Sequence, residues 1–181
     1  MVWKTGPNSQ LGLANANPAI PDSVPGGMGA VTAGYIATQI GQIAQFFEDT
    51  QGPAELIYLP GVAALTAGDI VYYDLTPGAQ ATTRLINNVQ NNTGRPVAVA
   101  IGAPLAGQYG WFQISGTAII NGLAGLVAGA CYASATAGSV KTAADAGDQI
   151  MGAQILTALG TPAAGKSYAL LNRPSMQGQI I

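Results

Sequence analysis

The stretch from Gln108 to Ile120 constrains the fold most, because its side chains alternate with the period of a β-strand. One face of the predicted strand carries apolar residues, namely Phe112, Ile114, Ala118 and Ile120. The opposite face carries Trp111, Gln113, Ser115 and Thr117. The pattern predicts a half-buried strand, with one face in a hydrophobic core and the other in contact with something else. We therefore expect an all-β protein.

From residue 61 onward the chain repeats itself at a spacing of about 60 residues, which is typical of tandem structural units. A Leu-x-Ala-Gly turn precedes a strand pattern at Leu65–Gly68 and again at Leu126–Gly129. A Pro-x-Ala-Gly turn then precedes another strand pattern at Pro104–Gly107 and at Pro162–Gly165. Ala and Gly are common in this chain, so chance similarity is the alternative explanation. The order and the near-constant spacing favour two small barrel- or sandwich-like β modules in tandem.

Residues 31–47 fit two secondary structures. Ile36, Ile40, Ile43 and Phe47 have helical spacing, whereas the residues 42–47 also read as a strand. A turn cluster at Glu48–Pro53 and the apolar run Leu56–Leu59 follow, and together they favour a hairpin over residues 41–59. A helix over residues 31–40 stays open.

The first 30 residues contain Pro7, Pro18, Pro21 and Pro25, and their apolar residues follow no helical or strand period. We expect an extended arm that is ordered by contact with another subunit, the alternative being a loose terminus. The apolar arm residues that a neighbour could contact include Trp3, Leu11, Leu13 and Ile20. The predicted organisation is an arm over residues 1–40, β modules over 41–120 and 121–175, and a tail over 176–181.

Charge is scarce in this chain of 181 residues: 49% of the residues are apolar, 8% are charged and the net charge is -2. A surface with so little charge is expected to be buried largely against partner proteins. The basic residues are scattered rather than clustered, so nucleic acid is not an expected partner.

The sequence contains few residues that could carry out catalysis. The chain has no histidine, and histidine is the commonest general base and metal ligand. Cys131 lies in an apolar run without a basic neighbour and is expected to be a small buried side chain. Asp145 and Asp148, like Glu48 and Asp49, lack the spacing of a metal loop and suit turns. We expect no enzyme activity, no catalytic residues, no metal and no cofactor.

Gly160–Ser167 matches the phosphate-binding loop pattern G-x-x-x-x-G-K-[ST], which makes nucleotide binding a distant alternative function. Such a loop places backbone N–H groups and a helix N-terminus around phosphates. Here a strand pattern that ends at Pro174 follows instead, and Pro162 removes one of the amides. We expect Lys166 to belong to a hairpin turn.

A membrane partner is not expected either. The apolar run Ala118–Ala133 is shorter than the roughly 20 residues that span a bilayer, and it contains Asn121. The first residues lack the charged segment and the apolar run of a secretory signal, so the protein is expected to stay at first in the cell that makes it.

Four segments of the chain resemble head proteins of tailed bacteriophages, and specifically small capsid decoration, or cement, proteins. The segments are Leu56–Val62, Arg95–Ala100, Gln108–Gly116 and Ala146–Ala153. The resemblance covers residues 41–175 but not the N-terminal arm, and Gln108–Gly116 is its most specific part. It brings no catalytic residues.

Decoration proteins are β-rich, often form trimers, and bind the outside of a shell built from a major capsid protein with the common tailed-phage fold. The resemblance therefore implies a structural virion protein that is made in the host cytoplasm and stabilises the capsid surface by bridging major capsid protein subunits. A homo-oligomer, with a trimer as the expected form, is implied as well. The expected contact residues, toward the shell or a sister subunit, are Trp3, Leu11, Leu13, Ile20 and Trp111. A head-fibre or tail component is the alternative.

Overall fold

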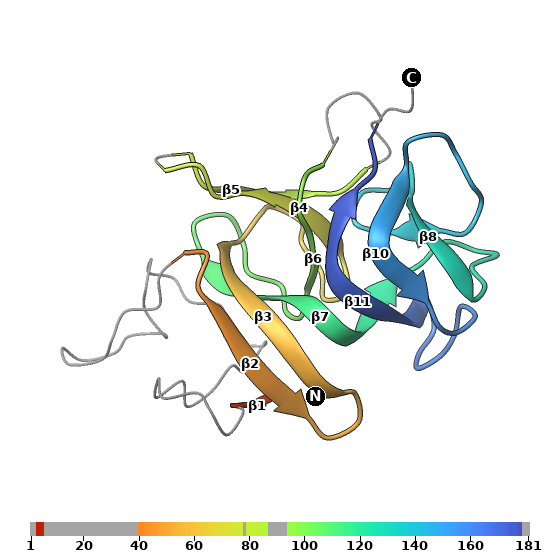
Figure 1. The fold of residues 1–181 in the computed structure, drawn as a ribbon, viewed down its shortest axis with the longest axis horizontal. Helices are drawn as coiled ribbons and strands as arrows, with labels where there is room; N and C mark the ends of the chain where they lie inside the picture. Colours follow the sequence, from red (N-terminus) through yellow and green to blue (C-terminus); the bar gives the residue numbers. More distant parts are fainter. Residues whose placement is uncertain (1–2, 6–39, 78, 87–93, 179–181) are drawn as a thin grey trace.

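The computed structural model describes residues 3–5, 40–77, 79–86 and 94–178, and these residues form strands and no helix (Figure 1). The predicted all-β fold class is confirmed. The described strands are β1 (Trp3–Thr5), β2 (Ile43–Glu48), β3 (Gly52–Pro60), β4 (Ile70–Asp74), β5 (Ala81–Arg84), β6 (Val97–Ala100), β7 (Tyr109–Asn121), β8 (Gly129–Ala133), β9 (Val140–Lys141), β10 (Gln149–Ile155) and β11 (Lys166–Met176).

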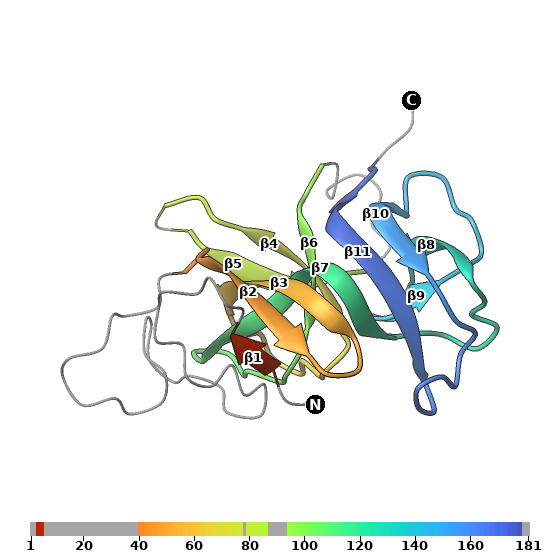
Figure 2. The same ribbon diagram turned by 60° about the horizontal axis from the view of Figure 1, so that its bottom comes forward.

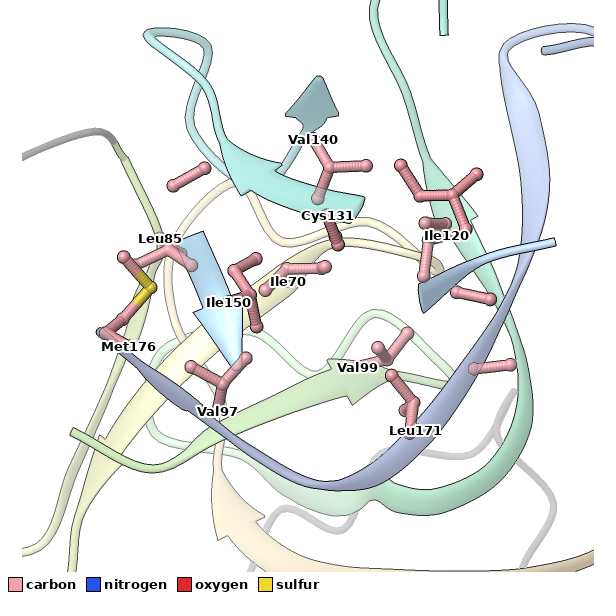
Figure 3. Close-up of a cluster of buried hydrophobic side chains, with 14 of the residues drawn as sticks. Ile70, Leu85, Val97, Val99, Ile120, Cys131, Val140, Ile150, Leu171 and Met176 are labelled. Carbon is pink, nitrogen blue, oxygen red and sulfur yellow. The ribbon is translucent and has the colours of Figure 1, made fainter. Parts of the chain in front are cut away.

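All the described strands belong to one hydrogen-bonded sheet, whose main path runs β1-β2-β3-β7-β11-β10-β8-β9. A branch leaves this path at β7, where β6 pairs with β7, β4 with β6 and β5 with β4. The strand predicted over Gln108–Ile120 is β7, which pairs with three other described strands. The sheet curls strongly, so that β6, β7, β10 and β11 curve around a common interior (Figures 1 and 3).

The sequence repeat has a counterpart in the strand pairing. Strands β4 to β7 and strands β8 to β11 pair in the same order, the first with the second and third, and the third with the fourth. The turns agree as well: Gln108 N–H donates to the Leu105 carbonyl, and Lys166 N–H to the Ala163 carbonyl, both at 2.9 Å. The leucines that begin the two Leu-x-Ala-Gly turns, Leu65 and Leu126, are both buried.

The two repeats share their largest hydrophobic cluster. Buried residues from both halves meet in it, including Ile70, Val97, Val99 and Ile120 from the first repeat and Cys131, Ile150 and Leu171 from the second (Figure 3). β7 and β11 also pair directly, from Asn121↔Lys166 to Ser115↔Asn172. A boundary between modules at residue 120 therefore stays a prediction, since pairing and packing both cross it.

The predicted hairpin over residues 41–59 is confirmed as β2 and β3, which pair from Ile43↔Ile57 to Glu48↔Gly52. The open question of a helix over residues 31–40 lies almost entirely outside the described residues. The hairpin also covers part of the second face of β7, the face that carries Trp111. Trp111 packs against Phe46 and Tyr58 of the hairpin, with ring centroids 5.1 and 5.3 Å apart.

One strand end differs from the prediction. We expected Pro174 to end the last strand, but β11 continues to Met176. The ladder tolerates the proline because pairing with β7 has already stopped at Asn172. On the other side a bulge interrupts pairing with β10 between Met151 and Ala153, so no ladder hydrogen bond needs an N–H at Pro174.

Candidate interaction surface

The outer edge of β2 lies at one end of the sheet and is only partly paired. β1 pairs antiparallel with it, from Trp3↔Glu48 to Thr5↔Phe46 (Figure 2). Gly6 and Pro7 follow β1 in the sequence, and proline has no N–H with which to continue a ladder. Among the described residues, no strand pairs with the outer edge of Ile43–Gln45. Unpaired edge strands are sites at which another chain can add a strand.

Beside this edge lies a groove of about 610 Å³. Its lining residues come from the β2–β3 hairpin, from β7 and from β11. In the sheet, β7 lies between the hairpin and β11 (Figure 1). The lining residues are Gln45, Phe46, Phe47, Pro53, Ala54, Glu55, Ser115, Gly116, Leu170, Leu171 and Asn172. We call this feature the hairpin groove.

The floor of the hairpin groove depends on a glycine. Gly116 has φ +89°, and a Cβ atom there would lie 2.3 Å from the Pro53 carbonyl oxygen. β3 and β7 approach each other this closely where their pairing shifts register, between Glu55 and Leu56. A side chain at position 116 would push β3 away from β7, so the glycine keeps the two strands at their present separation.

Large apolar side chains are exposed along the groove. Phe47 on β2 is 44% exposed and Leu170 on β11 is 45% exposed. Ile43, on the unpaired part of the β2 edge, is 44% exposed as well. Arg173 and Glu55 form an ion pair from β11 to β3 with Nε and Oε2 3.1 Å apart, so a charged bridge accompanies the apolar walls. The combination suits contact with an apolar, hydrogen-bonding protein segment.

The sequence-predicted contact residues are not brought together by the described part of the chain. Trp3 lies in β1, and Leu11, Leu13 and Ile20 lie outside the described residues. Trp111 is 8% exposed because the β2–β3 hairpin covers it. Since so little of the indole is accessible, we leave Trp111 out of the proposed surface.

Sequence analysis missed Phe47 and Leu170. A usable signal was present, because Phe46–Phe47 and Leu170–Leu171 are adjacent apolar pairs in strands. Successive side chains of a strand point to opposite faces, so both members of such a pair are buried only where both faces of the strand are covered. Phe46 and Leu171 are the buried members.

The phosphate-loop match spans the turn between β10 and β11, and a strand follows the turn instead of a helix. Lys166, which we expected in the turn, is the first residue of β11 and pairs with Asn121 of β7. The Lys166 side chain has contacts that the sequence did not suggest. Its Nζ donates hydrogen bonds to the Ala67 carbonyl and to Asn121 Oδ1, in the other repeat. Lys166 therefore links the two repeats.

Three further side chains that could carry chemistry are buried: Cys131, Asp148 and Glu48. Burial raises the pKa of Cys131 to about 12. Burial also raises the pKa of Asp148, although Lys141 acts in the opposite direction. Glu48 closes the β2–β3 turn by accepting hydrogen bonds from the backbone N–H groups of Thr50 and Gln51, both at 2.8 Å. No group of three or more potential metal ligands of the His, Cys, Asp or Glu type occurs among the described residues.

No protein family, no curated protein and no solved structure matches this chain. The described residues include no helix that is long and apolar enough to cross a membrane. What the protein does is therefore inferred from its own surface and sequence.

Proposed function

We propose that this protein is a structural component of a bacteriophage virion, a decoration protein on the outer surface of the capsid. There it ties neighbouring subunits of the major capsid protein together. The observation that carries the proposal is the exposed apolar hairpin groove beside a partly unpaired sheet edge, on a chain of which 8% of the residues are charged. The resemblance of segments such as Gln108–Gly116 to decoration proteins supports it.

Burial of the groove would supply the binding energy. Covering Phe47, Leu170 and Ile43 removes apolar surface from water, at about 25 cal/mol for each Å². A strand added beside Ile43–Gln45 would also satisfy backbone groups that have no strand partner there among the described residues. Apolar contact and edge pairing thus favour the same occupant, an extended segment of the major capsid protein.

The N-terminal arm extends the contact in this proposal. β1 places the start of the arm on the β2 edge, next to the hairpin groove. An arm tethered to a docked body has a high local concentration near the neighbouring subunit, so weak contacts by Leu11, Leu13 and Ile20 add up around a symmetric oligomer, which we take to be a trimer. Bridging of this kind would distribute the pressure on the shell over several bridged subunits.

The groove can be tested with heads that lack the protein. The double variant Phe47→Asp/Leu170→Asp places charge in the groove without removing a buried side chain. The matched control is Leu105→Asp/Val127→Asp, at side chains that are 54% and 53% exposed and outside the groove. The groove variant should bind heads at least about tenfold more weakly than the control, and it should protect them less against heating.

Each variant is first compared with the unchanged protein by circular dichroism and thermal unfolding, so that loss of binding is not confused with loss of folding. Equal binding of the groove variant and the control would contradict the proposed surface. Binding of the unchanged protein to purified tails but not to heads, seen in negative-stain images, would favour the alternative role as a tail component. A fibre role would appear as projections from the heads.

The arm is tested separately by deleting residues 1–30. The shortened protein should remain folded but bind heads more weakly, so that less dilution is enough to detach it. Heads that carry it should rupture at a lower temperature than heads that carry the full chain. A shortened protein that binds and protects as well as the full chain would show that the arm is not a strap.

A further inference from the structure

A second, smaller cavity lies away from the hairpin groove. Its volume is about 250 Å³, and it is bounded by the β2–β3 turn, the turn before β4, the end of β6, the middle of β7 and the β10–β11 turn. Apolar residues dominate its lining, among them Ile101, Ile119, Pro162 and Ala163. Among the described lining residues, Lys166 is the one with a charged side chain.

The ammonium group of Lys166 lies against the Ala67–Gly68 part of the cavity wall. Nζ donates to the Ala67 carbonyl and to Asn121 Oδ1, and a Cβ atom at Gly68 would lie 3.0 Å from it. An ammonium group has three N–H donors. The third has no hydrogen-bond acceptor among the described residues, so it is available to a bound group.

Positive charge is in excess around this ammonium. Within the described residues Lys166 forms no ion pair, and Asp69, whose charge acts on Lys166, pairs instead with Arg84, with Oδ2 and Nε 2.8 Å apart. Asp69 also accepts hydrogen bonds from Thr66 N–H and Asn121 Nδ2, each at 2.8 Å. One carboxylate thus faces two cationic side chains, and the described residues that line the cavity include no acidic residue.

The electrostatics of Lys166 agree with this geometry. Burial lowers the pKa of Lys166, and the field of Asp69 opposes that effect without cancelling it. An ammonium that has lost water and lacks a direct anionic partner is stabilised by any carboxylate that reaches it.

We propose that this cavity binds a carboxylate carried on a short aliphatic stem. The carboxylate accepts a hydrogen bond from Lys166 Nζ, and the stem lies against Ile101, Ile119 and Pro162. At about 30 Å³ for a group the size of a water molecule, the cavity holds on the order of eight non-hydrogen atoms. A small fatty acid and a glutamate side chain of a neighbouring protein present this same chemistry. The site does not depend on the proposed capsid function.

Hexanoate is the probe, because its carboxylate and five further carbons match the cavity in size. Titrated into the full chain and followed by ¹H–¹⁵N correlation spectra, it should give saturable shifts at Ile101, Ile119 and Ala163. Hexanamide has the same shape without the charge and should bind at least about tenfold more weakly. Shifts that do not saturate, or equal affinity for both compounds, would overturn the proposal.

Two variants locate the site. Lys166→Met keeps an unbranched stem and removes the ammonium, so it should lose hexanoate binding. Because Lys166 also links the repeats, Ile119→Phe serves as the second variant, since it fills the cavity without touching the ammonium. Lys141→Met, at a lysine outside the cavity, should bind hexanoate like the unchanged protein. Retained binding in both cavity variants would contradict the assignment.

The natural source of the carboxylate is identified in assembled particles. A zero-length carbodiimide cross-link from Lys166 to an acidic residue of another chain would assign the ligand to a partner protein. A carboxylic acid released from the purified protein and detected by mass spectrometry would assign it to a small molecule. Either result supports a carboxylate at Lys166.

Discussion

Arg84 and Asp69 form an ion pair across the first repeat, with Nε 2.8 Å from Oδ2, and the carboxylate is almost wholly buried. The guanidinium also donates through Nη2 to the Ala137 carbonyl at 2.8 Å, so Arg84 ties the end of β5 to the turn after β8. Gly138 leaves room for this arrangement, since a Cβ atom there would lie 2.5 Å from the Asp69 carboxylate. The two repeats therefore meet at a charged group as well as at their shared core.

The first prediction follows from that burial. Arg84→Met should lower the free energy of unfolding by about 3 kcal/mol, because it leaves the Asp69 carboxylate buried without its cation. Urea unfolding followed by tryptophan fluorescence measures the change. Arg173→Met is the matched control, since it breaks the exposed pair with Glu55 and should leave the urea midpoint nearly unchanged. Equal losses in the two variants would contradict a special role for the buried pair.

Much of the fold could be predicted from the sequence because its signals are local. The alternation of Gln108–Ile120 locates β7, and the turn cluster Glu48–Pro53 separates β2 from β3. The repeated turns predict that the strands after residue 61 form two similar sets, and β4–β7 and β8–β11 do pair in the same order. The extension of β11 past Pro174 could not be predicted, because it depends on a bulge in β10 and on where pairing with β7 stops.

The candidate sites were less accessible to sequence reasoning, because residues far apart in the chain build them. Whether Trp111 faces a partner or the interior depends on where the β2–β3 hairpin folds back. Lys166 meets Ala67 and Asn121 only through the arrangement of both repeats. Composition indicates that the surface is apolar, but only strand register decides that Phe47 is exposed and Phe46 is not.

The second prediction compares two phenylalanines. Phe112 on β7 is fully buried, as predicted from the alternation, whereas Phe47 on β2 is 44% exposed. Phe112→Ala should lower the free energy of unfolding by about 3 to 5 kcal/mol, through lost burial and the cavity left behind. Phe47→Ala should lower it by less than about 1 kcal/mol while weakening attachment to heads. Chemical denaturation gives both values, and a small loss for Phe112→Ala would place it outside the core.

The third prediction uses two carboxyl groups with opposite pKa shifts. Burial raises the pKa of Asp148, with Lys141 opposing it. Burial also acts to raise the pKa of Glu48, but hydrogen bonds from Thr50 and Gln51 outweigh it, and the net shift is downward. A raised pKa in the folded state contributes stability at low pH that is lost as the pH rises through it, and a lowered pKa does the reverse.

Stability measured by urea unfolding from about pH 3 to about pH 7 separates the two groups. Relative to Asp148→Asn, the unchanged protein should become less stable as the pH rises through the raised pKa. Relative to Glu48→Gln, it should become more stable as the pH rises through the ordinary carboxyl range. The two difference curves should therefore slope in opposite directions, and parallel curves would show that one shift has the wrong sign.

The last prediction concerns the floor of the hairpin groove. Gly116 and Gly107 both have positive φ, +89° and +82°, so alanine is strained at either position. They differ in their surroundings, because a Cβ atom at Gly107 meets nothing within 4 Å whereas one at Gly116 lies 2.3 Å from the Pro53 carbonyl oxygen. Gly107→Ala should lower the free energy of unfolding by about 1 to 2 kcal/mol through backbone strain alone.

Gly116→Ala carries the same backbone strain, and it also forces β3 away from β7 at the floor of the groove. Its loss of stability should exceed that of Gly107→Ala by at least about 1 kcal/mol, the lower end of the cost of overpacking. Since the displaced strand lines the groove, attachment to heads should weaken in Gly116→Ala and stay unchanged in Gly107→Ala. Thermal unfolding and head binding of the two variants, measured side by side, check both parts. Equal stability losses would mean that β3 moves aside freely, and the groove would then not be a preformed surface.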